Sequence, residues 1–250
     1  MHQSPDPVIH TAPSGSRVYA IGDIHGRSDL LRRLHAMILE DAAPDSPDAA
    51  DLRKVVVYVG DYVDRGPDSA SVIGMLIEEP LQGFESHPLK GNHEDMMIRF
   101  LESGEGGEMW MFNGGRDTLD SYGIGLSDLS QFLDDREALA QAFGDAVPES
   151  HRAFLDGLRL YHREGDYLFV HAGMRPGVAL EDQNEQDLIW IRDEFTDSDT
   201  DFGAIVVHGH SIRAEPETRP NRIGIDTGAW RSNRLTALVL EGNTRRFLQT

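Results

Sequence analysis

Residues 60–66 (GDYVDRG) place two carboxylates and a guanidinium within five consecutive positions. Asp61 follows the β-branched and aromatic run 54–59 after a single glycine, and Asp64 and Arg65 come three and four residues later. Such a set could hold a metal, orient a base and bind an oxyanion. Taken alone, it could also be a surface turn closed by a salt bridge. The flanking glycines permit sharp turns, and ligands of open α/β sheets bind at strand ends of this kind.

One pattern recurs along the chain: a short apolar strand ends in an Asp, Asn or His with glycine nearby. It occurs five times, at Asp23 and His25, at Asp61, at Asn92 and His93, at His171, and at His210. If these strand ends converge, they offer two carboxylates, one amide oxygen and three imidazoles besides His93. This mixture of oxygen and nitrogen ligands suits Mn²⁺, Fe or Zn²⁺ better than Ca²⁺. Six ligands suit two ions that share a carboxylate, for which Asp61 is the natural bridge.

Short strands must deliver these residues. The sequence predicts strands at 17–22, 54–59, 84–89, 167–170 and 204–207, and two closing strands at 222–225 and 235–240. Pro88 weakens the strand at 84–89. Apolar residues at helical spacing predict a helix that begins at Ser28 or Asp29, one at 68–79 and one at 95–102.

The pattern changes between residues 103 and 164. Clustered glycines are followed by helical signals at 126–143 and 149–160, which we interpret as a helical insertion over one side of the site. Trp110, Met111 and Phe112 are expected to form its packing core. Residues 1–16 are expected to be a flexible tail and residues 17–250 a single domain.

Composition limits the possible functions. The chain has 250 residues, of which 39% are hydrophobic and 26% charged, as in soluble globular proteins. It shows no apolar run that could span a bilayer and no signal-peptide pattern, so we expect a cytoplasmic protein. The small size of the single chain suggests a monomer. The absence of cysteine excludes disulfides, thiolate zinc sites and a cysteine nucleophile. A net charge of −20 argues against nucleic-acid and membrane partners, so an anionic substrate must be attracted locally by metal ions and arginines.

Several segments together resemble the phosphoprotein phosphatase family. Residues 22–26 (GDIHG), 60–66 (GDYVDRG) and 91–94 (GNHE) resemble its three signature motifs. Residues 171–173 (HAG) and 209–210 (GH) resemble its two later metal-histidine motifs. The match runs in order from residue 18 to about residue 212. Its compact form resembles the bacterial and bacteriophage protein phosphatases among the calcineurin-like metallophosphoesterases.

This resemblance implies an α/β fold in which two mixed β-sheets pack face to face as a sandwich flanked by helices. It also implies a role for each matching residue. The first metal would be held by Asp23, His25 and Asp61, and the second by Asp61, Asn92, His171 and His210. His93 would be the general acid oriented by Asp64, and Arg65 would bind the phosphoryl oxygens. Arg192, within residues 188–192 (LIWIR), would bind them too. Mn²⁺ is the first expectation for both ions, with Fe or Zn²⁺ as alternatives.

The implied reaction is hydrolysis of phosphoserine and phosphothreonine in proteins by a metal-bridging hydroxide, without a phosphoenzyme. The intact Asp64–Arg65 pair favours a protein substrate. The alternatives are hydrolysis of dinucleoside polyphosphates or of another small phosphoester, and a non-catalytic binding module that uses the fold as a scaffold. An acidic balance without a basic stripe disfavours a nuclease.

Other polar residues are interpreted as structural. Glu94 is expected to cap or buttress its helix, and His208 to support its neighbours. The acidic run 197–201 fails as a Ca²⁺ loop because Phe202 and His208 occupy the positions that need Gly and Glu. Structural or surface roles are expected for His2, His10, His35, His87, His151 and His162.

Overall fold

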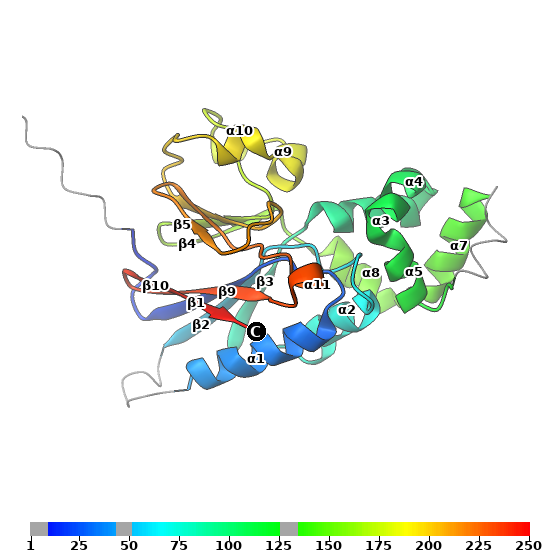
Figure 1. Ribbon diagram of the computed structural model, residues 1–250, viewed down its shortest axis with the longest axis horizontal. Coiled ribbons are helices and arrows are strands. Elements are labelled where there is room, and N and C mark those ends of the chain that lie inside the picture. Colours follow the sequence, from blue (N-terminus) through cyan, green and yellow to red (C-terminus); the bar gives the residue numbers. More distant parts are fainter. Residues whose placement is uncertain (1–9, 44–51, 126–134) are drawn as a thin grey trace, which may run out of the picture.

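The computed structural model describes residues 10–43, 52–125 and 135–250. Two five-stranded sheets face each other at its centre (Figure 1). The first has the order β10-β9-β1-β2-β3, with β1, β2 and β3 parallel and β9 and β10 antiparallel. Its strands are β1 (Ser16–Ile21), β2 (Arg53–Tyr58), β3 (Phe84–Pro88), β9 (Thr236–Glu241) and β10 (Thr244–Gln249).

The second sheet has the order β4-β5-β6-β8-β7, with β5, β6 and β8 parallel and an antiparallel strand at each edge. Its strands are β4 (Tyr161–Glu164), β5 (Tyr167–Val170), β6 (Ile205–His208), β7 (Glu217–Thr218) and β8 (Arg222–Gly224). Two mixed sheets with helices outside are the predicted fold, and this prediction is confirmed.

Helices cover the outer faces of both sheets and one end of the sandwich (Figure 1). The first sheet is covered by α1 (Ser28–Asp41) and α2 (Ser69–Glu78), and the second by α9 (Glu185–Trp190) and α10 (Asp193–Thr196). To the right in Figure 1 lie α3 (Asn92–Ser103), α4 (Gly107–Trp110), α5 (Arg116–Ser121), α7 (Arg136–Ala146) and α8 (Glu149–Asp156). The π-helix η2 (Met111–Gly115) joins α4 to α5, a 3₁₀ turn η4 spans Leu180–Asp182, and α11 spans Ala229–Ser232.

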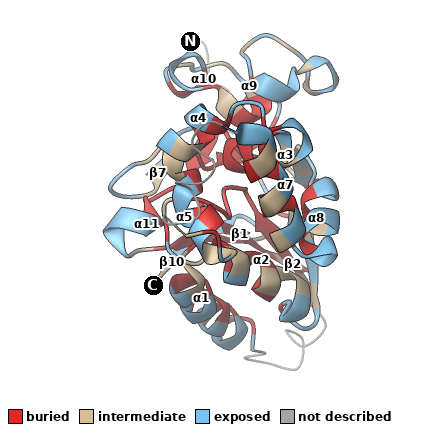
Figure 2. Cartoon of the chain, turned by 90° about the vertical axis from the view of Figure 1, so that its right-hand side faces the viewer, coloured by how far each residue is buried: buried red, intermediate tan, exposed pale blue. Residues whose placement is uncertain are grey.

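Side chains that point alternately to the two faces of the central strands divide the hydrophobic core into layers. In β1, Val18 and Ala20 face the second sheet, whereas Tyr19 and Ile21 face the helices of the first sheet. Because successive side chains in a strand point to opposite faces, one strand serves both layers. Figure 2 shows the consequence: buried residues fill the interior, and the exposed ones lie on the outer surfaces of the helices. In the part of the chain that the structure describes, no helix is long and apolar enough to cross a membrane.

The predicted insertion differs from the observed one. Its glycine-rich start is helical, because α4, η2 and α5 occupy 107–121. Its predicted end lies inside the second sheet, since β4 covers Tyr161–Glu164. Of the helix expected at 126–143, residues 126–134 lie outside the described residues, and α7 continues to residue 146. Three strands were not predicted, namely β4, β7 and β10.

Two further expectations are wrong in part. Phe112 is 88% exposed and does not belong to a packing core, whereas Trp110 is completely buried and Met111 packs against the core. Within the expected tail, residues 1–9 lie outside the described residues. The amide of Thr11 donates to Asp166 at 2.8 Å, and the amide of Ala12 donates to the Gly242 carbonyl at 2.8 Å. The segment from residue 10 is therefore bound to the domain.

Candidate active site

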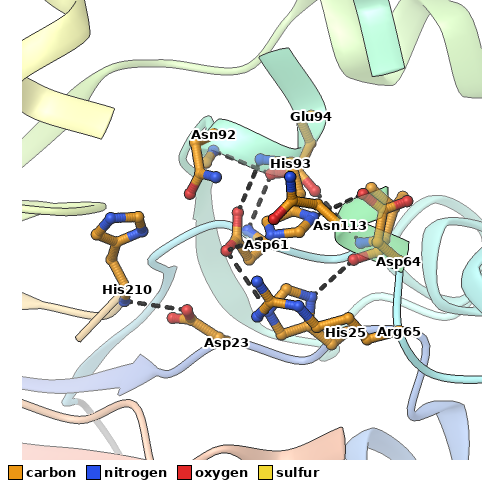
Figure 3. Close-up of polar contacts among 12 residues, drawn as sticks. Asp23, His25, Asp61, Asp64, Arg65, Asn92, His93, Glu94, Asn113 and His210 are labelled. Carbon is orange, nitrogen blue, oxygen red and sulfur yellow. Dashed lines mark hydrogen bonds and ion pairs between the residues drawn. The ribbon is translucent and has the colours of Figure 1, made fainter. Parts of the chain in front are cut away.

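The five predicted strand ends meet at one end of the sandwich. Figure 3 shows the residues of four of them, and His171, from the fifth, lies beside Asp61. Because the strands that carry them are parallel within each sheet, their carboxyl ends lie at the same edge. The loops after β1 and β2 carry Asp23 and His25, and Asp61. The first turn of α3, after β3, carries Asn92 and His93. The loop after β5 carries His171, and the loop after β6 carries His210.

The backbone at these strand ends is unusual. Among the described residues, six that are not glycine adopt a positive φ, and five of them are predicted site residues. These five are His25, Asp61, Asp64, Arg65 and His210, with φ between 47° and 72°. Non-glycine residues in this region cost conformational energy and cluster at functional sites. The strained backbone conformations therefore occur at residues that were predicted from the sequence to form the site.

Asp61 lies at the centre of the cluster. Its Oδ2 is 3.5 Å from His25 Nε2, and its Oδ1 is 3.4 Å from His171 Nε2. Two groups of potential metal ligands share it: one with His25 and His93, and one with His171 and His210. Burial alone would raise the pKa of Asp61, but the surrounding imidazoles, His171 first, outweigh it and lower the pKa. Asp61 is thus an ionised carboxylate placed between two groups of nitrogen ligands.

Two histidines present a lone pair to this centre. Nδ1 of His25 is 2.8 Å from the Val63 carbonyl, and Nδ1 of His171 is 2.8 Å from the Val59 carbonyl. A carbonyl can only accept, so the proton is on Nδ1 and the lone pair is on Nε2. Burial lowers the pKa of both imidazoles and keeps them in the neutral form that binds metal.

Several atoms of the cluster need a cation as partner. His171 Nε2 faces Asn92 Oδ1 at 2.9 Å, which sets one acceptor against another. Asp23 Oδ1 and His210 Nε2 are buried and have no hydrogen-bond partner among the described residues. The Arg65 guanidinium, itself a cation, lies 2.7 Å from His25 Nε2. Buried polar atoms are normally paired, so the residues present fit a pair of divalent cations.

His93 and Asp64 form a dyad beside this cluster. His93 Nδ1 is 2.6 Å from Asp64 Oδ2, and His93 Nε2 points toward Asp61, 3.9 Å from its Oδ2. Burial opposes protonation of His93, but the charges of Asp61 and Asp64 outweigh it and raise the pKa of the imidazole. A protonated His93 can therefore present its Nε2–H to a group bound at the cluster, as a general acid must.

A cavity of about 240 Å³ opens over Asp61 and His210. Three arginines line it, Arg65, Arg192 and Arg213, and none of them has a carboxylate within ion-pair distance among the described residues. Arg192 lies at the start of α10, and its guanidinium approaches the His210 carbonyl at 3.4 Å. Guanidinium groups in this position suit an anion with several oxygens, such as a phosphoryl group.

Glu94 supports the site from behind. Its carboxylate is completely buried and accepts hydrogen bonds from the amides of Asp61, Tyr62 and Gly91 at 2.7–2.9 Å. The amide of Val63 lies slightly farther away, at 3.3 Å. Burial raises the pKa of Glu94, and the amide donors act against that rise. Glu94 therefore ties the Asp61 loop to α3, as the expected buttress.

Sequence analysis missed some contacts of the site. Trp110 and Thr118 both donate hydrogen bonds to Asp64. The other two tryptophans also adjoin the site, Trp190 beside the His210 ring and Trp230 beside the Arg65 guanidinium. The available signal was the tryptophan itself, because a buried indole N–H requires an acceptor.

A separate group of potential ligands, His87, His162 and Glu164, lies where β3 meets β4. The two imidazoles stack at 3.7 Å, and Arg53 binds both oxygens of Glu164 at 2.8 and 2.9 Å. The guanidinium neutralises the only carboxylate of the group and repels a dication. This group therefore serves as an ion-pair network between the sheets, as the structural interpretation of both histidines expected.

His208 is also structural. Its Nδ1 lies 3.0 Å from the Gly209 carbonyl, and its ring packs edge-on against Phe195. Burial lowers its pKa to about 4. The ring contact with Phe195 joins the end of β6 to α10, whose N-cap is Arg192.

Comparisons with known proteins agree with this geometry. The family model of calcineurin-like phosphoesterases matches residues 16–229. An asymmetrical bis(5'-nucleosyl)-tetraphosphatase, PrpE, of Bacillus thuringiensis is 27% identical over 87% of this chain and 88% of its own length. Serine/threonine-protein phosphatase 2 of Escherichia coli K12 is 28% identical over 88% of this chain and 90% of its own length. A crystal structure provisionally named a diadenosine tetraphosphatase shares the fold with a TM-score of 0.63, at 21% identity over 97% of this chain and 98% of its own.

Proposed function

This chain belongs to the calcineurin-like phosphoesterase family, and from this premise we propose that it is a binuclear metal-dependent phosphomonoesterase that hydrolyses phosphoserine and phosphothreonine in proteins. Hydrolysis of phosphoesters follows from the family. The protein substrate and the roles of individual residues are the parts that we propose.

One observation carries the proposal: the His93–Asp64 dyad and the three-arginine cavity adjoin the same carboxylate, Asp61, which both groups of potential metal ligands share. A phosphomonoester needs its charge neutralised, its phosphorus oriented and its leaving oxygen protonated. The proposed metal ligands are Asp23, His25 and Asp61 for one ion and Asp61, Asn92, His171 and His210 for the other. When bound, two divalent cations would supply charge neutralisation and a water of lowered pKa.

The remaining work falls to side chains of this chain. Arg65 and Arg192 would bind the non-bridging oxygens from the cavity wall. His93, held through Nδ1 by Asp64, would give its Nε2 proton to the departing serine or threonine oxygen. An open cavity in front of these groups suits a phosphorylated side chain that projects from a protein surface.

A second candidate function has its own support. Hydrolysis of dinucleoside tetraphosphates is the activity named for the Bacillus thuringiensis relative. Trp230 is 36% exposed and lines a neighbouring cavity that also includes Arg65. The guanidinium of Arg231 lies 5.9 Å from its ring. An aromatic surface beside two guanidinium groups suits a nucleobase attached to phosphates.

The test uses chelator-stripped protein with and without Mn²⁺. Substrates are p-nitrophenyl phosphate, a phosphothreonine peptide and diadenosine tetraphosphate, and His93→Asn is assayed beside the wild type. We expect Mn²⁺-dependent phosphate release from the first two and a loss of about 10²-fold or more in the variant on the peptide. Preferential cleavage of the dinucleotide would replace the protein substrate with the second candidate. No turnover with Mn²⁺, Fe²⁺, Zn²⁺ or Co²⁺ would refute both.

A further inference from the structure

The insertion contributes hydrogen-bond donors to the dyad. Trp110 Nε1–H donates to both carboxylate oxygens of Asp64, at 3.0 Å each, and the Thr118 hydroxyl donates to Oδ1 at 2.6 Å. All three residues are completely buried. His93 Nδ1 provides the third donor, to Oδ2. The Asp64 carboxylate is thus held by two elements: α3, which carries His93, and the segment 107–121, which carries Trp110 and Thr118.

The backbone beside Asp64 is bound to the same segment. The Asp64 amide donates to the hydroxyls of Thr118 at 2.9 Å and Ser69 at 3.0 Å, and these hydroxyls are 3.0 Å apart. The Arg65 amide donates to the Gly114 carbonyl at 3.3 Å. Asp64 and Arg65 both have positive φ, so these contacts hold a strained turn in place.

The indole is itself fixed. Its ring lies 4.9 Å from Phe100 in α3 and 5.4 Å from Phe143 in α7, measured between centroids. A side chain at Gly115 would collide with the indole, so the segment approaches Trp110 closely only because that position is glycine. The position of the indole N–H that donates to Asp64 therefore depends on α3, on α7 and on η2, which carries Gly115.

From this geometry we propose that Trp110 and Thr118 are positioning residues for the acid step: they lock the Asp64 carboxylate so that His93 presents its Nε2 proton to the leaving oxygen. This inference rests on the proposed function, in which His93 is the general acid. A water oxygen bonds to phosphorus while the bond between phosphorus and the serine or threonine oxygen breaks. The proton of His93 goes to the oxygen that leaves, the proton that the water loses can restore His93, and the products are inorganic phosphate and the free hydroxyl.

A physical reason separates this role from simple packing. The terminal torsion of an aspartate is soft, so one hydrogen bond to His93 leaves the carboxylate free to rotate. Donors at both oxygens remove that freedom. If positions 110 and 118 only filled space, phenylalanine and valine, which lack these donors, would serve equally well.

The test exploits the leaving group. An alkyl oxygen, as in a phosphothreonine peptide, needs protonation as it departs, whereas p-nitrophenolate departs readily without it. For Trp110→Phe and Thr118→Val, we expect kcat on the peptide to fall about 10- to 100-fold and kcat on p-nitrophenyl phosphate to fall less than about 3-fold. Thr118→Ser keeps the hydroxyl and should restore the wild-type ratio of the two rates.

Two controls keep the result interpretable. Leu119→Ala removes buried apolar contacts from the same helix without touching Asp64, and it should leave the ratio of the two rates unchanged. In a His93→Asn background, where the acid is absent, Trp110→Phe and Thr118→Val should cause no further loss. Thermal unfolding of each variant reports whether it folds.

Three outcomes would overturn the inference: equal losses on both esters, failure of Thr118→Ser to restore the ratio, or a full additional loss in the His93→Asn background. They differ from failure of the proposed function. That failure appears as a wild-type enzyme without Mn²⁺-dependent turnover, or as His93→Asn acting like wild type on the peptide.

Discussion

Glu94 shows how a single carboxylate can organise a site without facing its substrate. Its two oxygens accept hydrogen bonds from amides in the loop after β2 and from the amide of Gly91, the N-cap of α3. We expect Glu94→Gln to lower the free energy of unfolding by about 1–3 kcal/mol, because the new NH₂ group faces amide donors and leaves buried N–H groups unpaired. Urea unfolding measures the change.

The same substitution should affect activity beyond its effect on stability. The Asp61 loop would no longer be tied to α3, so Mn²⁺ affinity should fall together with turnover. Glu102→Gln, on the exposed part of the same helix, is the matched control and should behave as wild type. Unchanged stability and metal affinity in Glu94→Gln would show that the amides are satisfied in some other way.

At the scale of elements, the glycine before α3 sets how closely that helix approaches β2. A side chain at Gly91 would collide with the carboxylate and the amide of Asp61. We expect Gly91→Ala to reduce kcat/KM for p-nitrophenyl phosphate by about 10²-fold or more, because displacement of reacting groups by about 1 Å is costly.

Gly74 in α2 provides the matched control for that substitution. A side chain there meets only ordinary contact, 3.9 Å from His151. Gly74→Ala should therefore keep full activity and stabilise the protein by about 0.5–1 kcal/mol, since glycine disfavours helix interiors. If Gly74→Ala also lost activity, the glycine effect would not be specific to the site.

Packing of α1 on β2 should make stability depend on pH. His35 in α1 lies 2.9 Å from the Tyr58 hydroxyl in β2, and burial lowers its pKa to about 4. In the unfolded chain, the His35 imidazole has its ordinary pKa of about 6.5. Between about pH 4 and pH 6.5 the unfolded chain therefore binds more protons than the folded state. The free energy of unfolding consequently decreases by up to roughly 3 kcal/mol as pH falls from about 6.5 to 4.

Chemical denaturation at pH 7 and pH 5 measures this loss. In His35→Gln, which cannot titrate, the decrease in unfolding free energy between the two values should be smaller than in wild type. An identical decrease would place the acid sensitivity elsewhere in the molecule.

Elements differed in how well the sequence predicted them, for physical reasons. Strands such as β2 and β5 are β-branched or aromatic runs buried on both faces, a pattern that few other structures produce. β10 (TRRFLQ) is a mostly polar edge strand without regular alternation, and its signal was the short turn at Gly242 and Asn243. The segment 107–121 has clustered glycines that disfavour helix, and tertiary packing around Trp110 decides its structure.

The site was predictable for the same reason as the strands. Each residue of the cluster lies within a few positions of the end of a strand, so local sequence determines where it lies. The partners of Asp64 come from a segment about 50 residues later, whose placement depends on the whole helical group. No local pattern connects Thr118 with Asp64.

At the scale of the whole molecule, a strongly acidic chain surrounds a cavity with three arginines that lack carboxylate partners among the described residues. A long-range field of this sign attracts cationic sequences, whereas the cavity attracts the phosphoryl group. For a phosphothreonine peptide flanked by lysines, kcat/KM should fall several-fold between about 20 and 200 mM salt, because ions screen the exterior charge.

A peptide with glutamates in place of those lysines is the matched control. Its kcat/KM should stay constant or rise over the same range of salt concentration. Parallel behaviour of the two peptides would show that the exterior charge does not influence their capture.

The placement of the tryptophans has a practical consequence. The chain has three tryptophans, and each adjoins a different part of the site: Trp110 at Asp64, Trp190 at His210 and Trp230 at Arg65. No indole of this chain is therefore remote from the chemistry, and the intrinsic fluorescence of the unlabelled protein is a reporter of the site alone. Binding of ions or of an anion can be followed by emission, and single Trp→Phe variants would divide that signal among the dyad, the metal ligands and the arginines.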